Sequence, residues 1–255
     1  KEEIAKIKAD ADDFYGEYMC DPKRSENKFF DIERIERDMR NVREPKRESA
    51  GVKYFIDYLP HHRYGQASDH SDGIGLDSNT LAGFDFTTNE LAYTYANNLI
   101  APDLAAHEFA RIGSEYGNCL YAPEVNNKCG GIVIATLKEI PYRKIYTQYI
   151  EDKVYTKKTE KLGWETNGKT KRKLLFDFRK DYNDGIIKIY DKNVLQEMKA
   201  YTNNDIEEGV SLVTRHFDLL MAVMIAWQMR DLVRGSEVKK EERQPMSKDE
   251  MYSAI

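Results

Sequence analysis

The stretch YGQASDHSDGIGLDSNTLAGFD, residues 64–85, joins two extended segments through an acidic loop that contains two glycines. The first extended run ends at Asp69, the loop continues to Asp77, and an alternating run leads away over residues 80–87. This order predicts an aspartate at the end of a β-strand, where the sheet holds the backbone and the side chain reaches an open edge. The alternative is an ordinary Asp- and Gly-rich turn.

Two further carboxylates occupy comparable positions. Glu124 follows the apolar run CLYAP, and Asp218 precedes the apolar run LLMAVMIAWQM. A helix that is apolar nearly all round is buried, so Asp218 is expected at or below the surface. The alternative is an ordinary acidic residue at a helix start, which the helix dipole stabilises. Glu124 taken alone could be a solvated loop residue. If the three carboxylates converge, they offer the hard oxygen ligands that Mg²⁺ or Mn²⁺ prefers.

Length and composition indicate a soluble, globular chain with one substantial domain, or with one domain and a helical arm. The chain has 255 residues, of which 33% are charged and 41% are hydrophobic. No apolar run approaches the roughly 20 residues of a membrane span, and there is no signal-peptide pattern. The three cysteines form no CxxC pair, which argues against a zinc ribbon and favours reduced thiols in a cytosolic compartment. Because the chain starts without Met, we expect a piece of a longer protein.

Charge patterning predicts three regions. Residues 1–51 contain 14 acidic and 12 basic residues through Ala50, as expected for a helical arm or interdomain segment that ends in a linker over 43–51. Residues 52–234 form the main domain, and the charged segment 235–255 is expected to be a disordered tail. The alternative for the first region is that its helices pack on the main domain.

Periodicity and turn residues predict the following elements of the main domain. A short strand within 52–59 is expected outside the main sheet. Strands are expected at 64–68, 81–87, 91–97, 118–122 and 185–190, helices at 102–116, 130–140, 169–182, 191–201 and 218–233, and a projecting hairpin within 145–166.

Positive charge is concentrated in residues 153–173, which hold eight basic and two acidic residues although the whole chain has a net charge of −5. Such a run is commonly a solvated face. Beside an acidic metal site it also suits the phosphate backbone of a nucleic acid.

The segment Gly163–Thr170 matches the P-loop pattern GxxxxGK[ST] letter for letter. A P-loop follows a buried apolar strand, whereas the residues before this segment, TKKTEKL, are polar and charged. We therefore expect a turn before a basic helix, and nucleotide binding stays as an alternative.

Taken together, these segments resemble the C-terminal nuclease domain of the large terminase subunit of tailed bacteriophages, an RNase H-like (RuvC-like) endonuclease. The resemblance covers roughly residues 52–233 and rests on ASDHSDGIGLDS, PEVNN, GWETNGKTK and RHFDLLMAV in that order. FYGEYMCDP followed by KFF resembles the link between motor and nuclease in such proteins. The resemblance implies a mixed β-sheet flanked by helices, with a projecting β-hairpin and an N-terminal helical arm.

By position, the resemblance implies that Asp69, Glu124 and Asp218 are the catalytic metal ligands and that Asp77 is an accessory ligand. The family often has two aspartates at the start of the last helix, whereas this chain has Phe217 before Asp218. Two ions about 3.5–4 Å apart would activate a water and stabilise the leaving oxygen, with Asp69 as the bridging ligand.

The implied substrate is double-stranded DNA, concatemeric and cut with little sequence specificity, because contacts to phosphates carry little sequence information. The residues expected to contact its backbone are Lys157, Lys158, Lys169, Lys171 and Arg172. The implied partners are the terminase ATPase domain, the small terminase subunit and the portal, and the implied location is the host cytoplasm. Since the chain is acidic overall, we expect weak DNA binding without those partners.

Three other classes remain open. A junction resolvase or transposase would share the acidic triad, a P-loop ATPase would depend on Lys169, and a structural or adaptor domain would use the acidic residues only as surface charge.

Overall fold

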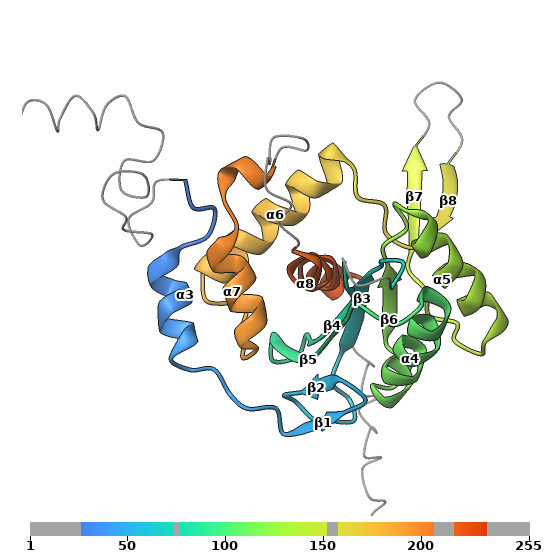
Figure 1. The fold of residues 1–255 in the computed structure, drawn as a ribbon, viewed down its shortest axis with the longest axis horizontal. Helices are drawn as coiled ribbons and strands as arrows, with labels where there is room; N and C mark the ends of the chain where they lie inside the picture. The colour runs from blue at the N-terminus through green and yellow to red at the C-terminus, as the bar shows by residue number, and fades with distance from the viewer. Residues whose placement is uncertain (1–26, 74–76, 152–157, 207–216, 234–255) are drawn as a thin grey trace, which may run out of the picture.

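The protein is described by a computed structural model over residues 27–73, 77–151, 158–206 and 217–233. A six-stranded mixed sheet in the order β1-β2-β5-β4-β3-β6 forms its centre (Figure 1). Only β3 and β6 run parallel among the paired strands of this sheet, and the other neighbours are antiparallel. The strands are β1 (Arg47–Ser49), β2 (Val52–Tyr54), β3 (Tyr64–Asp69), β4 (Asn79–Asp85), β5 (Glu90–Asn97) and β6 (Leu120–Pro123).

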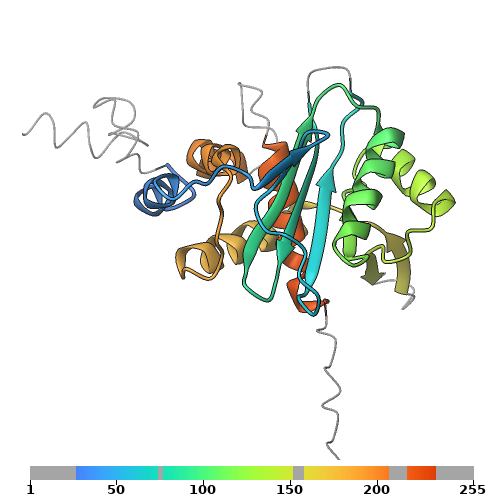
Figure 2. The same cartoon turned by 90° about the horizontal axis from the view of Figure 1, so that it is seen from below.

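Helices cover both faces of the sheet (Figure 2). One face packs against α4 (Pro102–Glu115) and α5 (Lys128–Glu139), and the other packs against α8 (Asp218–Gln228). Outside α8 lie α6 (Gly168–Asn183), α7 (Lys192–Ala200) and α3 (Ile32–Met39). This arrangement confirms the expected mixed sheet flanked by helices.

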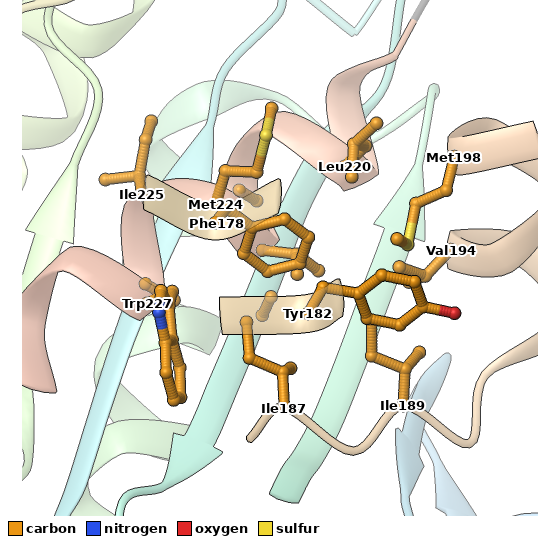
Figure 3. Packing of buried hydrophobic residues seen from close by; sticks show 14 of the residues in the cluster. Phe178, Tyr182, Ile187, Ile189, Val194, Met198, Leu220, Met224, Ile225 and Trp227 are labelled. Atoms are coloured by element: carbon orange, nitrogen blue, oxygen red, sulfur yellow. The ribbon is translucent and has the colours of Figure 1, made fainter. Parts of the chain in front are cut away.

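The helix α8 is the centre of the larger core. Every residue of the helix from Leu219 to Gln228 except Met221 is buried, as expected for an apolar helix between a sheet and a second helix layer. Trp227 packs edge-on against Phe84 of β4, with ring centroids 5.3 Å apart. Figure 3 shows side chains of α6, α7 and α8 interlocking around Phe178 and Tyr182.

A two-stranded hairpin, β7 (Thr147–Glu151) and β8 (Lys158–Leu162), forms a separate small sheet. It projects beyond the main body in Figure 1, as the sequence predicts. The backbone of Tyr146, just before β7, hydrogen-bonds to Tyr121 of β6, so the hairpin is anchored at the edge of the main sheet.

Three expectations for single elements were wrong. The strand expected outside the main sheet is β2, which pairs with β5 inside it, and the expected linker contains β1. The turn Ala50–Gly51 joins these two strands with φ of 51° and 80°, the left-handed conformation that a two-residue hairpin turn needs. Residues 185–190 form no strand, because β2 occupies the β5 edge from Tyr93 onward and leaves only a single bridge between Lys188 and Glu90.

The ends of the domain also differ in detail from the sequence pattern. The last α-helix stops at Gln228 and continues only as a 3₁₀ turn over Met229–Asp231. At the other end, Ile32 and Ile35 of α3 are buried in the main core, so this helix packs on the domain. Residues 1–26 of the expected arm and the tail 235–255 lie outside the described residues. Within the described ranges, no helix is long and apolar enough to cross a membrane.

Candidate metal centre

The first predicted ligand, Asp69, is the last residue of the central strand β3. This strand is unusually polar, but its buried polar groups have partners: the Gln66 amide donates to the Phe109 carbonyl and accepts from the Tyr93 hydroxyl. Residues 64–68 are buried, and Asp69 is partly exposed at the sheet edge. The strand therefore fixes the backbone of Asp69, and the His70 amide donates to its Oδ1 at 2.8 Å.

Glu124 lies beside Asp69 because β6 runs parallel to β3. Ser68 is paired with Pro123, and the Glu124 amide donates to the Ser68 carbonyl at 2.9 Å. The two carboxylates consequently follow adjacent strand ends at one edge of the sheet. The structure brings together these two residues, which are 55 positions apart in the sequence, as the parallel pairing requires.

Asp218 reaches the same edge from the start of α8. Its Oδ2 accepts from the Ser78 amide at 2.9 Å, and its carbonyl accepts from the Thr80 hydroxyl at 2.9 Å. Thr80 pairs with Asp69 across β3 and β4. These contacts place the first residue of α8 over the same strand ends as Asp69.

The pKa of Asp69 is raised well above its usual range. Burial is the largest cause, followed by the charge of Glu124, a hydrogen bond with Glu124 and the charge of Asp218, while the His70 amide opposes the shift. The strongest influences on Asp69 therefore include two carboxylates and no cationic side chain. His70 cannot supply the missing positive charge, because burial lowers its pKa to about 4 and keeps the imidazole neutral.

This donor set fits a divalent cation. The three groups are hard oxygen donors, and a cation between them would remove the repulsion that raises the Asp69 pKa. Within the described ranges, no three His, Cys, Asp or Glu side chains are placed so that they could hold a metal ion together as they stand. Asp218 contributes to the raised pKa of Asp69 through its charge, whereas Glu124 contributes through both its charge and a hydrogen bond.

The other two positions near this edge have different surroundings. Asp77 lies in the β3–β4 loop, where its carbonyl accepts from the Ser71 hydroxyl, and its role as an accessory ligand stays a prediction. Phe217 occupies the position at which the resemblance predicts a second aspartate. Its ring packs against Tyr201, with ring centroids 4.9 Å apart.

Asparagines that the sequence reasoning missed hold the loops around the site. Asn79 binds the backbone of Ser71 through both amide atoms, and Asn127 donates to the His70 carbonyl at 2.7 Å. Asn126 makes a reciprocal pair with the Thr166 backbone, at 2.6 and 2.7 Å. The two consecutive asparagines in PEVNN were a visible signal, because amide side chains commonly bind loop backbone.

The basic residues predicted to contact DNA lie on the hairpin and on α6. Lys158 begins β8, Lys169 and Arg172 are exposed in the first half of α6, and Lys171 donates to the Asp205 carbonyl. Lys157 lies outside the described residues. The Asn126–Thr166 pair joins the Glu124 loop to the segment that leads into α6, so part of the basic surface is fixed relative to the acidic edge.

The P-loop look-alike has a structural explanation. A Cβ on Gly163 would come within 2.5 Å of Val125, so this glycine permits close contact with the Glu124 loop. Asn167 caps α6, and the Thr170 hydroxyl completes the capping box, which occupies the groups that a P-loop uses for phosphate and Mg²⁺. The preceding strand, β8, belongs to the small hairpin, in contrast to the buried strand of a P-loop.

No family model matches the sequence, and no curated protein matches it. Solved structures match the fold. The large terminase nuclease of thermophilic phage G20c, with bound cobalt or with bound magnesium, superimposes with TM-scores of 0.59 and 0.58 at 14% identity. Each of these matches covers 80% of this chain and 98% of the other. The Thermus phage P74-26 large terminase nuclease domain has a TM-score of 0.54 at 14% identity and covers 76% of this chain and 94% of the other. The chain therefore has the fold of large terminase nuclease domains.

Proposed function

We propose that this chain is the nuclease of a viral genome-packaging terminase and cuts concatemeric double-stranded DNA as a metal-dependent endonuclease. The observation that supports this most directly is the placement of Asp69, Glu124 and Asp218 at the same ends of the central strands, where Glu124 and Asp218 help to raise the pKa of Asp69. The shared fold with terminase nucleases, one of them solved with bound magnesium, supports the same conclusion.

Asp69, Glu124 and Asp218 would hold Mg²⁺ or Mn²⁺, with Asp77 as an accessory ligand. Two such ions would supply an activated water and stabilise the leaving oxygen of a phosphodiester. Asp69 is the best candidate for the bridging position, since it interacts with both other carboxylates. The amides of His70 and Ser78 each donate to one carboxylate, of Asp69 and Asp218 respectively, and thereby orient these ligands.

DNA would lie along the hairpin and α6, with Lys157, Lys158, Lys169, Lys171 and Arg172 contacting phosphates. Contacts of this kind fix the position of the duplex and read little sequence, so cleavage should be weakly specific. The packaging ATPase, the small terminase subunit and the portal would then bring DNA to the site in the host cytoplasm. A resolvase or transposase would use the same carboxylates on a branched or terminal substrate.

Plasmid cleavage tests the proposal. We expect supercoiled plasmid to be nicked or linearised with Mn²⁺ or Mg²⁺ and to stay intact with EDTA. Asp69→Asn should lower the rate by about 10³-fold or more, because it removes the central ligand. A four-way junction cut in preference to linear duplex would instead indicate a resolvase.

Lys169→Ala tests the nucleotide-binding alternative. Because Lys169 is one of five proposed phosphate contacts, its loss should lower metal-dependent cleavage by no more than a few fold, and neither protein should bind ATP. Unchanged cleavage in Asp69→Asn would show that the acidic edge is not the active site.

A further inference from the structure

The start of α8 depends on another helix for its cap. The residue before the helix is Phe217, which makes no side-chain capping hydrogen bond. The amides of the first turn of a helix have no partner inside the helix and need acceptors from elsewhere. The carboxylate of Asp218, the first residue of the helix, accepts from the Ser78 amide on the sheet side.

Glu197 of α7 provides this acceptor. Its Oε2 accepts from the Leu220 amide at 2.7 Å, two residues after Asp218. A carboxylate at this position also interacts favourably with the positive end of the α8 dipole. Glu197, Phe217 and Leu219 also help to line an open surface pocket of about 540 Å³ beside this contact.

The α7 platform is itself well fixed. Val194 and Met198, on either side of Glu197 in the helix, are fully buried in the main core. The Asp191 side chain caps α7 through the Asn193 amide and accepts from the Thr94 hydroxyl of β5. Glu197 thus connects a rigid part of the core to the first turn of α8.

Contacts from two sides fix the first turn of α8. On the sheet side, Ser78 and Thr80 donate to the carboxylate and the carbonyl of Asp218. On the side of α7, Glu197 accepts from the Leu220 amide. The electrostatics agree with this proximity: burial raises the pKa of Glu197 to about 7, with smaller upward contributions from Asp218 and Asp191, while the Leu220 amide lowers it.

We infer that Glu197 is a positioning residue for the metal centre, which sets the place of Asp218 by capping α8 from α7. This inference rests on the proposed function, because it presumes that Asp218 is a metal ligand. Groups hydrogen-bonded directly to a metal ligand typically change metal affinity or activity by about 10–100-fold when removed, and Glu197, which acts through the Leu220 amide, is expected at the lower end of this range.

The test measures Mn²⁺ affinity by isothermal titration calorimetry and, separately, plasmid cleavage against Mn²⁺ concentration. Glu197→Ala should weaken Mn²⁺ binding by about tenfold. Cleavage should need correspondingly more Mn²⁺ and should approach the parental rate at saturation. Glu197→Gln keeps an acceptor oxygen for Leu220 and should stay within about threefold of the parent. Glu197→Asp, too short to reach Leu220, should behave like alanine and serves if the alanine variant does not fold.

Asp181→Ala is the matched control at the other end of α8. Asp181 accepts from the Trp227 indole at 2.9 Å and pairs with Arg230, so its loss loosens the same helix far from Asp218. It should lower the Tm and leave Mn²⁺ affinity unchanged. Parental affinity in Glu197→Ala, or an equal loss in Asp181→Ala, would overturn the inference. A parent that neither binds Mn²⁺ nor cuts DNA would instead overturn the proposed function.

Discussion

Asp69 and Asp85 are the last residues of two neighbouring antiparallel strands, β3 and β4, so they lie at opposite ends of these strands. Their surroundings differ. Asp85, the last residue of β4, is fully buried; its Oδ2 lies 2.6 Å from His62 Nδ1, and its Oδ1 accepts from the Thr87 amide. Asp69, the last residue of β3, has Glu124 and Asp218 as its charged neighbours. Asp85 therefore has a histidine as its partner, whereas Asp69 has two other carboxylates close to it.

This difference separates a structural carboxylate from the one that we propose to bind a metal ion. A buried charge is costly unless it is paired and hydrogen-bonded, and Asp85 meets that condition with groups of its own chain. Asp69 accepts a hydrogen bond from the His70 amide, but burial and the neighbouring carboxylates of Glu124 and Asp218 still raise its pKa. The fold accommodates these neighbouring carboxylates, and under the proposed function a bound divalent cation would make their proximity favourable.

The largest expected effect is the difference in stability between two variants, Asp85→Ala and Asp69→Ala. Asp85→Ala leaves His62 and the Thr87 amide without their acceptor and should lower the free energy of unfolding by about 2–4 kcal/mol. Asp69→Ala loses the His70 amide contact but also removes repulsion, so its change should stay within about 1 kcal/mol. Urea unfolding in EDTA measures both, and equal losses in the two variants would contradict the comparison.

The sequence alone was sufficient to propose the three carboxylates. Asp69 and Glu124 end apolar or extended runs, and Asp218 begins the most apolar helix, so local pattern places each one at the end of an element. Their order along the chain then predicts a shared edge if the two strands are parallel, which they are. The elements of the sheet and most helices follow from the same periodicities.

The residues next to Asp69 and Asp85 in the sequence do not reveal which groups surround each carboxylate in the fold. Both follow small or apolar residues and precede loops, and the partner of Asp85 is a histidine 23 positions earlier whose contact exists only in the folded sheet. Glu197 was missed for the same reason, since it meets Leu220 across 23 residues and reads as an ordinary helix glutamate. The strand β1 was missed because its three residues, Arg-Glu-Ser, are all exposed at the sheet edge.

The pH dependence of stability should sharpen the comparison. Because the folded-state pKa of Asp69 is raised, the folded protein keeps a proton that the unfolded chain loses above about pH 4. The contribution of Asp69 to the free energy of unfolding therefore falls as the pH rises from about 4 toward the raised pKa of the folded state. His70 acts in the opposite direction, since burial lowers its pKa from 6.5 to about 4, so the parent alone is ambiguous.

The informative measurement is the difference in Tm between Asp69→Asn and the parent, from pH 5 to pH 8 in EDTA. The difference should grow in favour of the variant as the pH rises, because His70 is present in both proteins. Saturating Mn²⁺ should reverse this order at pH 8, since the ion replaces the proton only in the parent. A difference that is constant with pH would mean that Asp69 ionises normally in the folded state.

The smallest effect should come from changing the partner of Asp85. The His62 side chain is 24% exposed, so part of its interaction with Asp85 is open to solvent. His62→Gln keeps an N–H donor and should cost less than about 1 kcal/mol, whereas His62→Ala leaves one carboxylate oxygen of Asp85 without this contact and should cost about 1–3 kcal/mol. Urea unfolding and plasmid cleavage, measured on the same samples, separate the two edges. Both variants should cut DNA at the parental rate per folded molecule, because the proposed metal ligand Asp69 lies at the other end of the sheet from His62 and Asp85. If His62→Ala reduced cleavage as strongly as Asp69→Asn, the edge with Asp85 would also belong to the active site, and compensation of charge would no longer distinguish the structural aspartate from the functional one.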